Sequence, residues 1–145
     1  MARYYELPIS FGTLMQPNRD LVTCELRSSI AQNINLIITS KHKEHRFDDS
    51  YGCEIWDMDF ELILNEGAWK EKVNKSVLAC VKKHEIRLDN IESEINITEE
   101  EFVNKRTGFK GVRKKVMVTI TAIVKETGQP FKFNSYLFLS PISFE

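Results

Sequence analysis

The N-terminal half of the chain places hydrophobic residues at the spacing of an α-helix. They recur every three or four positions, which predicts an amphipathic helix over about 20–39. A short polar side chain, Asn18 or Asp20, is expected to accept the free amides of its first turn. Residues 1–19 have no steady period and contain prolines, so we interpret them as an N-terminal arm before a single domain over 20–145. The stripe consists of Val22, Leu26, Ile30, Ile34, Ile37 and Ile38.

A second helical stripe follows after a polar interval. The spacing of three or four resumes at Trp69 and continues to His84, which predicts a helix over about 68–84. The interval 40–54 is polar and lacks a period, so it predicts a loop or a short extended piece. Residues 55–64 are apolar but too few to distinguish helix from strand.

After His84 the hydrophobic period changes to two. This alternation predicts strands over 87–97, 112–125 and 130–140, the last two joined as a hairpin. Helices first and strands last predict an α+β fold, with two amphipathic helices packed on a small antiparallel sheet. The residues expected to be substantially buried are Val22, Leu26, Ile30, Ile34, Val73, Val77, Ile91, Val118, Ile120, Phe131 and Phe133.

Composition indicates a single globular domain in the cytoplasm. A chain of 145 residues with 42% hydrophobic content has the length of one domain and is too apolar to be disordered. The net charge of −1 excludes a global basic field for nucleic acid, though not a local patch. No apolar run reaches the ~18–20 residues of a membrane helix. The N-terminus lacks a secretory pattern, and 3 scattered cysteines fit a reducing compartment.

Candidates for catalysis or metal binding are present, but none has an informative spacing. No CxxC or HxxxH pair fixes two zinc ligands, so solvated histidines and core-packed cysteines are expected. Glycosidase chemistry needs two carboxylates at a set distance. The spacing of the acidic residues between positions 48 and 66 does not distinguish any two of them as such a pair. We therefore expect no catalytic activity, no cofactor and no structural metal. The residues considered are His42, His45, Cys53, Cys80 and His84 for zinc, and Asp48, Asp49, Glu54, Asp57, Asp59, Glu61 and Glu66 for hydrolysis.

The most distinctive charge feature is a reversal of sign. Residues 89–101 contain 6 acidic residues and no basic one, whereas residues 102–115 contain 6 basic residues and no acidic one. The basic segment 105–115 joins two predicted strands, so it should form a projecting loop or hairpin tip. Phe109 within it offers a ring for stacking on a nucleobase. Docking to a protein partner and simple solvation, with charges that discourage aggregation, are the alternatives.

Several motifs in this order resemble the GPW-type baseplate wedge family of contractile tails. Residues 30–39 (IAQNINLIIT) resemble the family's first-helix motif, and residues 46–55 (RFDDSYGCEI) its arginine–aspartate–glycine segment. After the second helix, Glu85-Ile86-Arg87 stands where the family has Glu-Pro-Arg. Isoleucine neither fixes φ nor removes an amide as proline does, so the charged pair is retained without that rigidity. The resemblance covers roughly residues 26–139.

The resemblance implies a non-catalytic structural role and a fold like the strand-exchanging handshake domain of the sheath. The most similar member is TssE, a baseplate subunit of type VI secretion, located at the inner face of the cytoplasmic membrane. Its implied partners are wedge proteins (TssF- and TssG-like) and sheath subunits (TssB- and TssC-like), with no nucleic acid and no membrane insertion. Because family members have been called lysozyme-like, a peptidoglycan hydrolase is the alternative, and a nucleic-acid-binding module acting through 105–115 is a further one.

Glu85 and Arg87 are the predicted partner-binding residues. If residues 85–87 are extended, both side chains point to the same side of the chain. At a desolvated interface, Arg87 would make bidentate contacts and Glu85 would accept hydrogen bonds from amides. The alternative is an ion pair within the domain.

Overall fold

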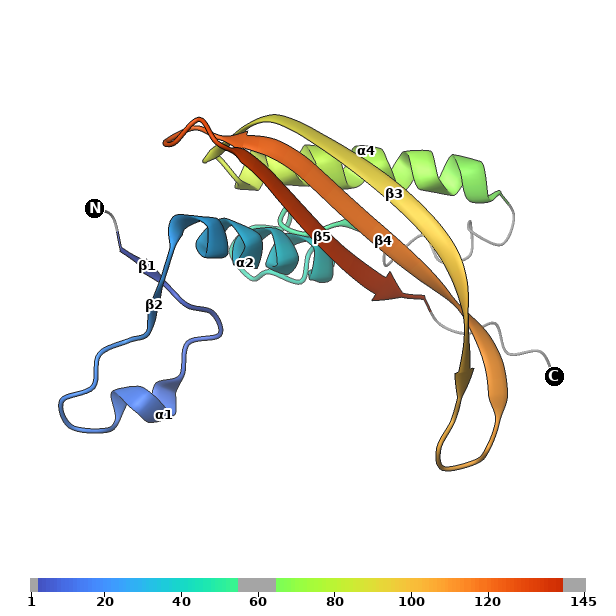
Figure 1. The fold of residues 1–145 in the computed structure, drawn as a ribbon, viewed down its shortest axis with the longest axis horizontal. Helices are drawn as coiled ribbons and strands as arrows, with labels where there is room; N and C mark the ends of the chain where they lie inside the picture. Colours follow the sequence, from blue (N-terminus) through green and yellow to red (C-terminus); the bar gives the residue numbers. More distant parts are fainter. Residues whose placement is uncertain (1–2, 55–64, 140–145) are drawn as a thin grey trace.

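The computed structural model describes residues 3–54 and 65–139, and it has the predicted α+β architecture (Figure 1). The element order is β1 (Tyr4–Tyr5), α1 (Phe11–Leu14), β2 (Thr23–Cys24), α2 (Leu26–Thr39), α4 (Glu66–His84), β3 (Leu88–Val103), β4 (Lys110–Val124) and β5 (Pro130–Phe138). Residues 55–64, which the sequence left unassigned, lie outside the described residues. In the described part of the chain, no helix is both long and apolar enough to cross a membrane.

Strands β3, β4 and β5 form one antiparallel sheet in that order, and the two long helices lie against one face of it (Figure 1). The alternation of side chains decides which residues face the helices. Ile95 is opposite Val118, and Val116 is opposite Leu137, so each of these pairs is buried on the helix side. The sequence prediction of an antiparallel sheet is therefore confirmed.

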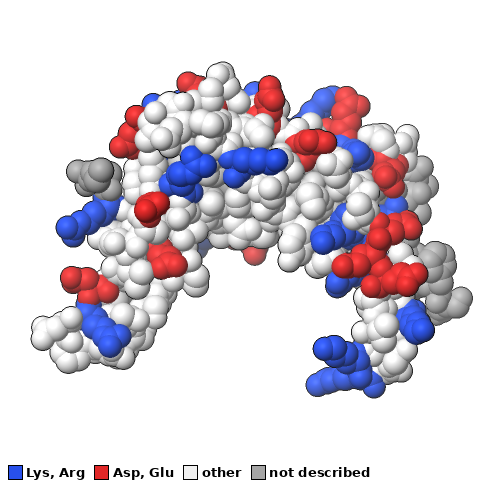
Figure 2. All heavy atoms as spheres, viewed as in Figure 1, with Lys and Arg blue, Asp and Glu red and all other residues white. Residues whose placement is uncertain are grey.

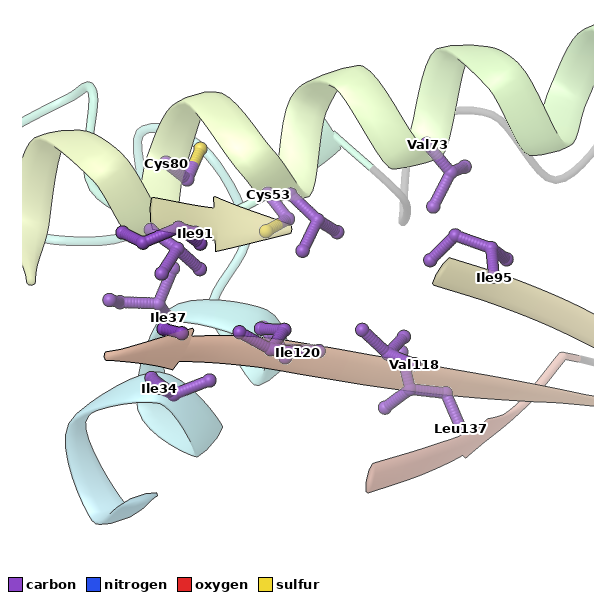
Figure 3. Packing of buried hydrophobic residues seen from close by; sticks show 14 of the residues in the cluster. Ile34, Ile37, Cys53, Val73, Cys80, Ile91, Ile95, Val118, Ile120 and Leu137 are labelled. Carbon is purple, nitrogen blue, oxygen red and sulfur yellow. The ribbon is translucent and has the colours of Figure 1, made fainter. Parts of the chain in front are cut away.

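The hydrophobic core lies between this face of the sheet and the helices (Figure 3). Helix α2 contributes four isoleucines, and α4 contributes Trp69, three valines and Cys80. Most of the predicted core is confirmed, with Leu26 and Phe133 only partly buried. Val22 is 55% exposed, so its prediction is wrong.

Helix α2 begins at Leu26, not near residue 20 as the spacing predicted. Thr23 and Cys24 pair with Tyr5 and Tyr4, and this pairing requires extended backbone where a first helical turn was expected. The capping position falls on Glu25, whose side chain makes no capping hydrogen bond. The predicted caps, Asn18 and Asp20, are therefore wrong. The hydrophobic spacing before Leu26 is typical of a helix, but strand pairing with the N-terminal arm keeps this part of the chain extended.

The strands around the charge reversal are longer than predicted. β3 continues to Val103 and β4 begins at Lys110, so only residues 104–109 form the connection. Asn104 closes this tip, because its N–H donates to the Phe109 carbonyl at 2.8 Å. The predicted basic loop 105–115 is thus a hairpin tip for its first residues and a strand for the rest. The prediction missed the strand because charged side chains on both arms obscured the period of two.

The molecule has the outline of an arch (Figure 2). The N-terminal arm with β1, α1 and β2 descends on one side, and the β3–β4 hairpin descends on the other (Figure 1). The surface between them is hollowed, and basic side chains gather at the end of the hairpin (Figure 2).

Candidate functional site

Glu85 and Arg87 lie at the junction where α4 ends and β3 begins. The Glu85 N–H donates to the carbonyl of Val81 at 2.9 Å as the last bond of the helix. Its side chain turns inward and is 1% exposed. Arg87 donates to both carboxylate oxygens of Glu85, through Nε and Nη2, each at 2.7 Å. The pair is therefore a bidentate ion pair within the domain.

Two further elements complete the shell around this pair. Asn33 of α2 donates from Nδ2 to Glu85 Oε2 at 2.9 Å, and Tyr51 donates its hydroxyl to Asn33 Oδ1 at 3.1 Å. The guanidinium of Arg87 donates from Nη1 to Ser29 Oγ at 2.9 Å. The three family-like motifs, far apart in the sequence, thus meet in one buried polar network.

The network also decides the ionisation of its members. Burial opposes ionisation of Glu85, but hydrogen bonds from Arg87 and Asn33 outweigh it and hold its pKa below the ordinary value. The hydrogen bond from Arg87 to Glu85 raises the pKa of Arg87 in turn. Both groups are therefore charged at neutral pH.

Glu85 and Arg87 were predicted as site residues from the sequence, but the residues that bind them were not. Asn33 and Tyr51 were visible within the motifs, yet periodicity alone assigned Asn33 no partner. The Arg87 side chain is 26% exposed and lies under the ring of Tyr4, 5.4 Å from its centroid. Arg87, not Glu85, thus reaches the surface, and a role of the two residues in partner binding stays a prediction.

A second candidate site for binding a protein partner is the outer edge of β5, the edge that faces away from β4. The Pro130 carbonyl points away from β4 and accepts from the Arg27 guanidinium of α2 at 3.0 Å. The Leu139 N–H points toward β4 and donates to the Lys114 carbonyl at 2.9 Å. Backbone groups alternate between the two edges of a strand. The N–H groups of Lys132, Asn134, Tyr136 and Phe138 therefore point away from β4, and no described strand pairs with them.

The histidines and cysteines considered for zinc divide into two groups. His42 contacts Cys80, with 3.6 Å between Nε2 and Sγ, and its Nδ1 lies 3.6 Å from Glu54 Oε1. His84 faces Ser50 and the ring of Tyr51 instead, and it is 11% exposed. The expectation of solvated histidines is therefore wrong for His84, whereas His42 is partly exposed. Among the described residues, no three such side chains are arranged to hold a metal ion.

The described acidic residues of the region 48–66 are dispersed. Hydrogen bonds from the side chain and backbone of Ser50 lower the pKa of Asp48, the opposite of what a general acid needs. Glu54 lies near His42, and Glu66 pairs with Lys114 at 3.1 Å. Asp57, Asp59 and Glu61 lie outside the described residues.

Comparison with known proteins identifies the fold. No family model and no curated protein matches the sequence. The structure is similar to the crystal structure of a protein from Geobacter sulfurreducens that is provisionally named a tail lysozyme. The TM-score is 0.58 and the sequence identity 18%, over 86% of this chain and 100% of that one. At this identity, the likeness shows a shared fold.

Proposed function

We propose that the chain is a non-catalytic structural subunit in the baseplate of a contractile injection machine, of the TssE kind. It binds wedge proteins like TssF and TssG and offers sheath subunits like TssB and TssC a strand template. The proposal is supported by the fold shared with a protein named for a tail and by the motifs that converge on Glu85 and Arg87. The observation that carries it is the outer edge of β5, which pairs with no strand among the described residues.

Between the two outer strands of the sheet, β5 is the better acceptor for a strand from another chain. β3 contains 6 acidic residues and a register shift between Asp89 and Glu92, features that protect an edge from strand addition. β5 contains a single charged residue, Lys132, and its outward amides continue to Phe138. Strand addition at β5 gains main-chain hydrogen bonds without disrupting the existing ladder.

Replacing Asn134 by proline tests this edge. Asn134→Pro removes one outward N–H and no bond to β4, and edge strands tolerate proline. Asn134→Ala is the matched control that keeps the amide. We expect both variants to fold, as judged by circular dichroism and melting temperature, while only Asn134→Pro loses sheath assembly in a sedimentation assay. A folded Asn134→Pro variant that assembles sheath as well as Asn134→Ala would overturn the role of the edge.

A peptidoglycan hydrolase is the alternative, favoured by the name of the Geobacter protein. Zymography on peptidoglycan, with an active lysozyme as positive control, separates the two functions. We expect no clearing by this chain. Clearing that persists after repurification would replace the structural proposal by the enzymatic one.

A further inference from the structure

A thiol, an imidazole and a carboxylate lie in a row on the surface where α4 meets the segment 40–54. Cys80 lies about one turn before the end of α4, and His42 and Glu54 come from the two ends of the segment. The Cys80 Sγ–His42 Nε2 and His42 Nδ1–Glu54 Oε1 distances are both 3.6 Å. The three residues line one pocket of about 610 Å³. The order of groups is that of an activated nucleophile, its base and an orienting acid.

A second thiol lies beside the first on its buried side. Cys53 is fully buried and Cys80 is 7% exposed, and of the two it is Cys80 that lines the pocket. The N–H of Cys53 donates to the Ser40 carbonyl at 2.9 Å, which holds this residue against the end of α2. The two thiols affect each other's ionisation: the pKa of Cys53 is raised and that of Cys80 is lowered.

The charges around Cys80 favour its thiolate. A hydrogen bond from Cys53 lowers the pKa of Cys80 to about 6, against the effect of burial and with the help of His42 and the more distant His84. The contact with Cys80 raises the pKa of His42. Lys72 and Lys75 line the same pocket, where Glu54 is an opposing charge and Glu71 pairs with Lys75 at 3.0 Å.

One contact opposes ionisation. The Cys80 thiol donates to the Gly52 carbonyl oxygen at 2.6 Å, and a thiolate loses this bond. Cys53 and His42 supply two donors in place of this one acceptor, and Cys53 has the larger effect on the pKa of Cys80. Changing His42 alone tests the contribution of His42 separately.

We propose that Cys80 is a reactive thiol that exchanges with small disulfides entering the pocket, and that Cys53 resolves the product to an internal Cys53–Cys80 disulfide. Nothing in the baseplate proposal requires this site. The partner is a low-molecular-weight disulfide that enters the pocket beside Cys80.

The chemistry balances in two exchange steps. The Cys80 thiolate attacks one sulfur of the small disulfide, whose sulfur–sulfur bond breaks and releases one thiolate that takes a proton from water. Cys53 then loses its proton to His42 or solvent and attacks Cys80 Sγ, and the second small thiol leaves. The two protein thiols are oxidised, and the disulfide is reduced to two thiols.

The test uses the full chain carrying Cys24→Ser, which leaves only this pair of thiols. The probe is oxidised glutathione, and intact-mass spectrometry with peptide mapping follows the product. We expect the internal disulfide in this background, a stable mixed disulfide at Cys80 when Cys53→Ser is added, and no adduct when Cys80→Ser is added. Reaction at Cys53 in the Cys80→Ser protein, or no reaction in the Cys24→Ser protein, would overturn the proposal.

The pH profile of alkylation by iodoacetamide distinguishes an activated thiol from one that is merely accessible. In the Cys24→Ser protein, the rate at Cys80 should rise through a midpoint near the pKa of about 6. With His42→Gln added, the midpoint should move upward. At about pH 5, below both midpoints, the rate should fall by ~10-fold for each unit of that shift, since each pKa unit is there a factor of ten in thiolate. A midpoint at the ordinary value of 9.0 in the His42-containing protein contradicts the proposal even if His42→Gln fails to fold.

Discussion

Glu85 loses nearly all contact with water on folding and regains hydrogen bonds from Arg87 and Asn33. Removing one member of such a buried pair leaves the other without a partner, which costs more than the pair contributes. The same geometry explains why a charged residue is retained at the end of a helix that otherwise buries only apolar side chains on this face. The network closes the seam between α2 and the α4–β3 junction.

Truncating Glu85 is expected to destabilise the isolated chain. Glu85→Ala removes the carboxylate that accepts from Arg87 and Asn33, and it should lower the free energy of unfolding by ~3–5 kcal/mol. Lys75→Ala, at an exposed pair with Glu71, is the control and should cost less than ~1 kcal/mol. Urea denaturation measures both. If Glu85→Ala keeps full stability but loses wedge binding, the two residues act at an interface, as the sequence analysis predicted.

The stabilisation by Glu85 should depend on acid pH. Because its folded pKa lies below the ordinary 4.5, its contribution is complete above pH 4.5 and is lost as the pH falls through the folded value. Glu85→Gln has no such carboxyl, so its melting temperature should approach that of the wild type as the pH falls from 6 to ~3. Asp48 titrates in both proteins, and its effect cancels in the difference. A constant difference over this range would show that ionised Glu85 does not stabilise the fold.

Gly52 is required by its conformation and by close packing. Its φ is +109°, and a Cβ there would lie 2.6 Å from the Ser40 carbonyl oxygen. Gly128 also has a positive φ, +67°, but no atom within 4 Å of a Cβ. Gly128→Ala should cost ~1 kcal/mol from backbone strain alone, and Gly52→Ala at least ~2 kcal/mol more. Thermal unfolding compares them, and equal losses would mean that the clash is relieved by movement of residues 40–41.

At the scale of elements, the charge reversal becomes a cross-strand pattern. The acidic end of β3 pairs with the basic start of β4, with Glu99 opposite Lys114 and Glu100 opposite Arg113. Arg113 binds Glu100 at 3.0 Å and stacks on Phe138 of β5, 3.6 Å from the ring centroid. Opposite charges on facing positions stabilise the register of the hairpin beyond the helix-covered core.

Reversing one charge should therefore weaken the outer hairpin. Arg113→Glu places like charges opposite each other and removes the contact with Phe138, which should cost ~1–2 kcal/mol. Adding Glu100→Arg restores opposite charges and should recover part of the loss but not the ring contact. Hydrogen exchange of the amides of residues 98–115 measures the local stability of the hairpin directly. No recovery in the double variant would show that the ion pair contributes nothing measurable.

At the scale of the whole molecule, the N-terminal arm adds little to the core. None of the described arm residues before β2 is buried, and the arm is attached through the β1–β2 pairing and the Leu7 N–H bond to Gln32 at 3.0 Å. Deleting residues 1–19 should leave a cooperative unfolding transition with a melting temperature a few degrees lower. Loss of cooperativity would place the arm within the folding unit and not beside it.

Local pattern was sufficient for most of the elements. The stripe of Trp69, Val73, Val77 and Val81 predicts α4, and alternation around Ile95 and Val118 predicts the sheet, because one buried face imposes its period on the chain. The polar segment 40–54 was also correctly assigned. These features depend on neighbours in the sequence, so the sequence contains the information needed to find them.

The remaining features depend on contacts between distant residues. Pairing with Tyr4 and Tyr5 decides that α2 starts at Leu26, and the partner strand decides how far β3 extends into the acidic run. Likewise, His42 meets Cys80 only because α4 packs on the segment 40–54. Glu85 receives its hydrogen bond from Asn33 only because the α4–β3 junction lies beside α2. By itself, the sequence determined which faces are apolar, whereas the tertiary structure decided which polar groups meet, because burial requires each to find a partner and many sequence-distant partners are available.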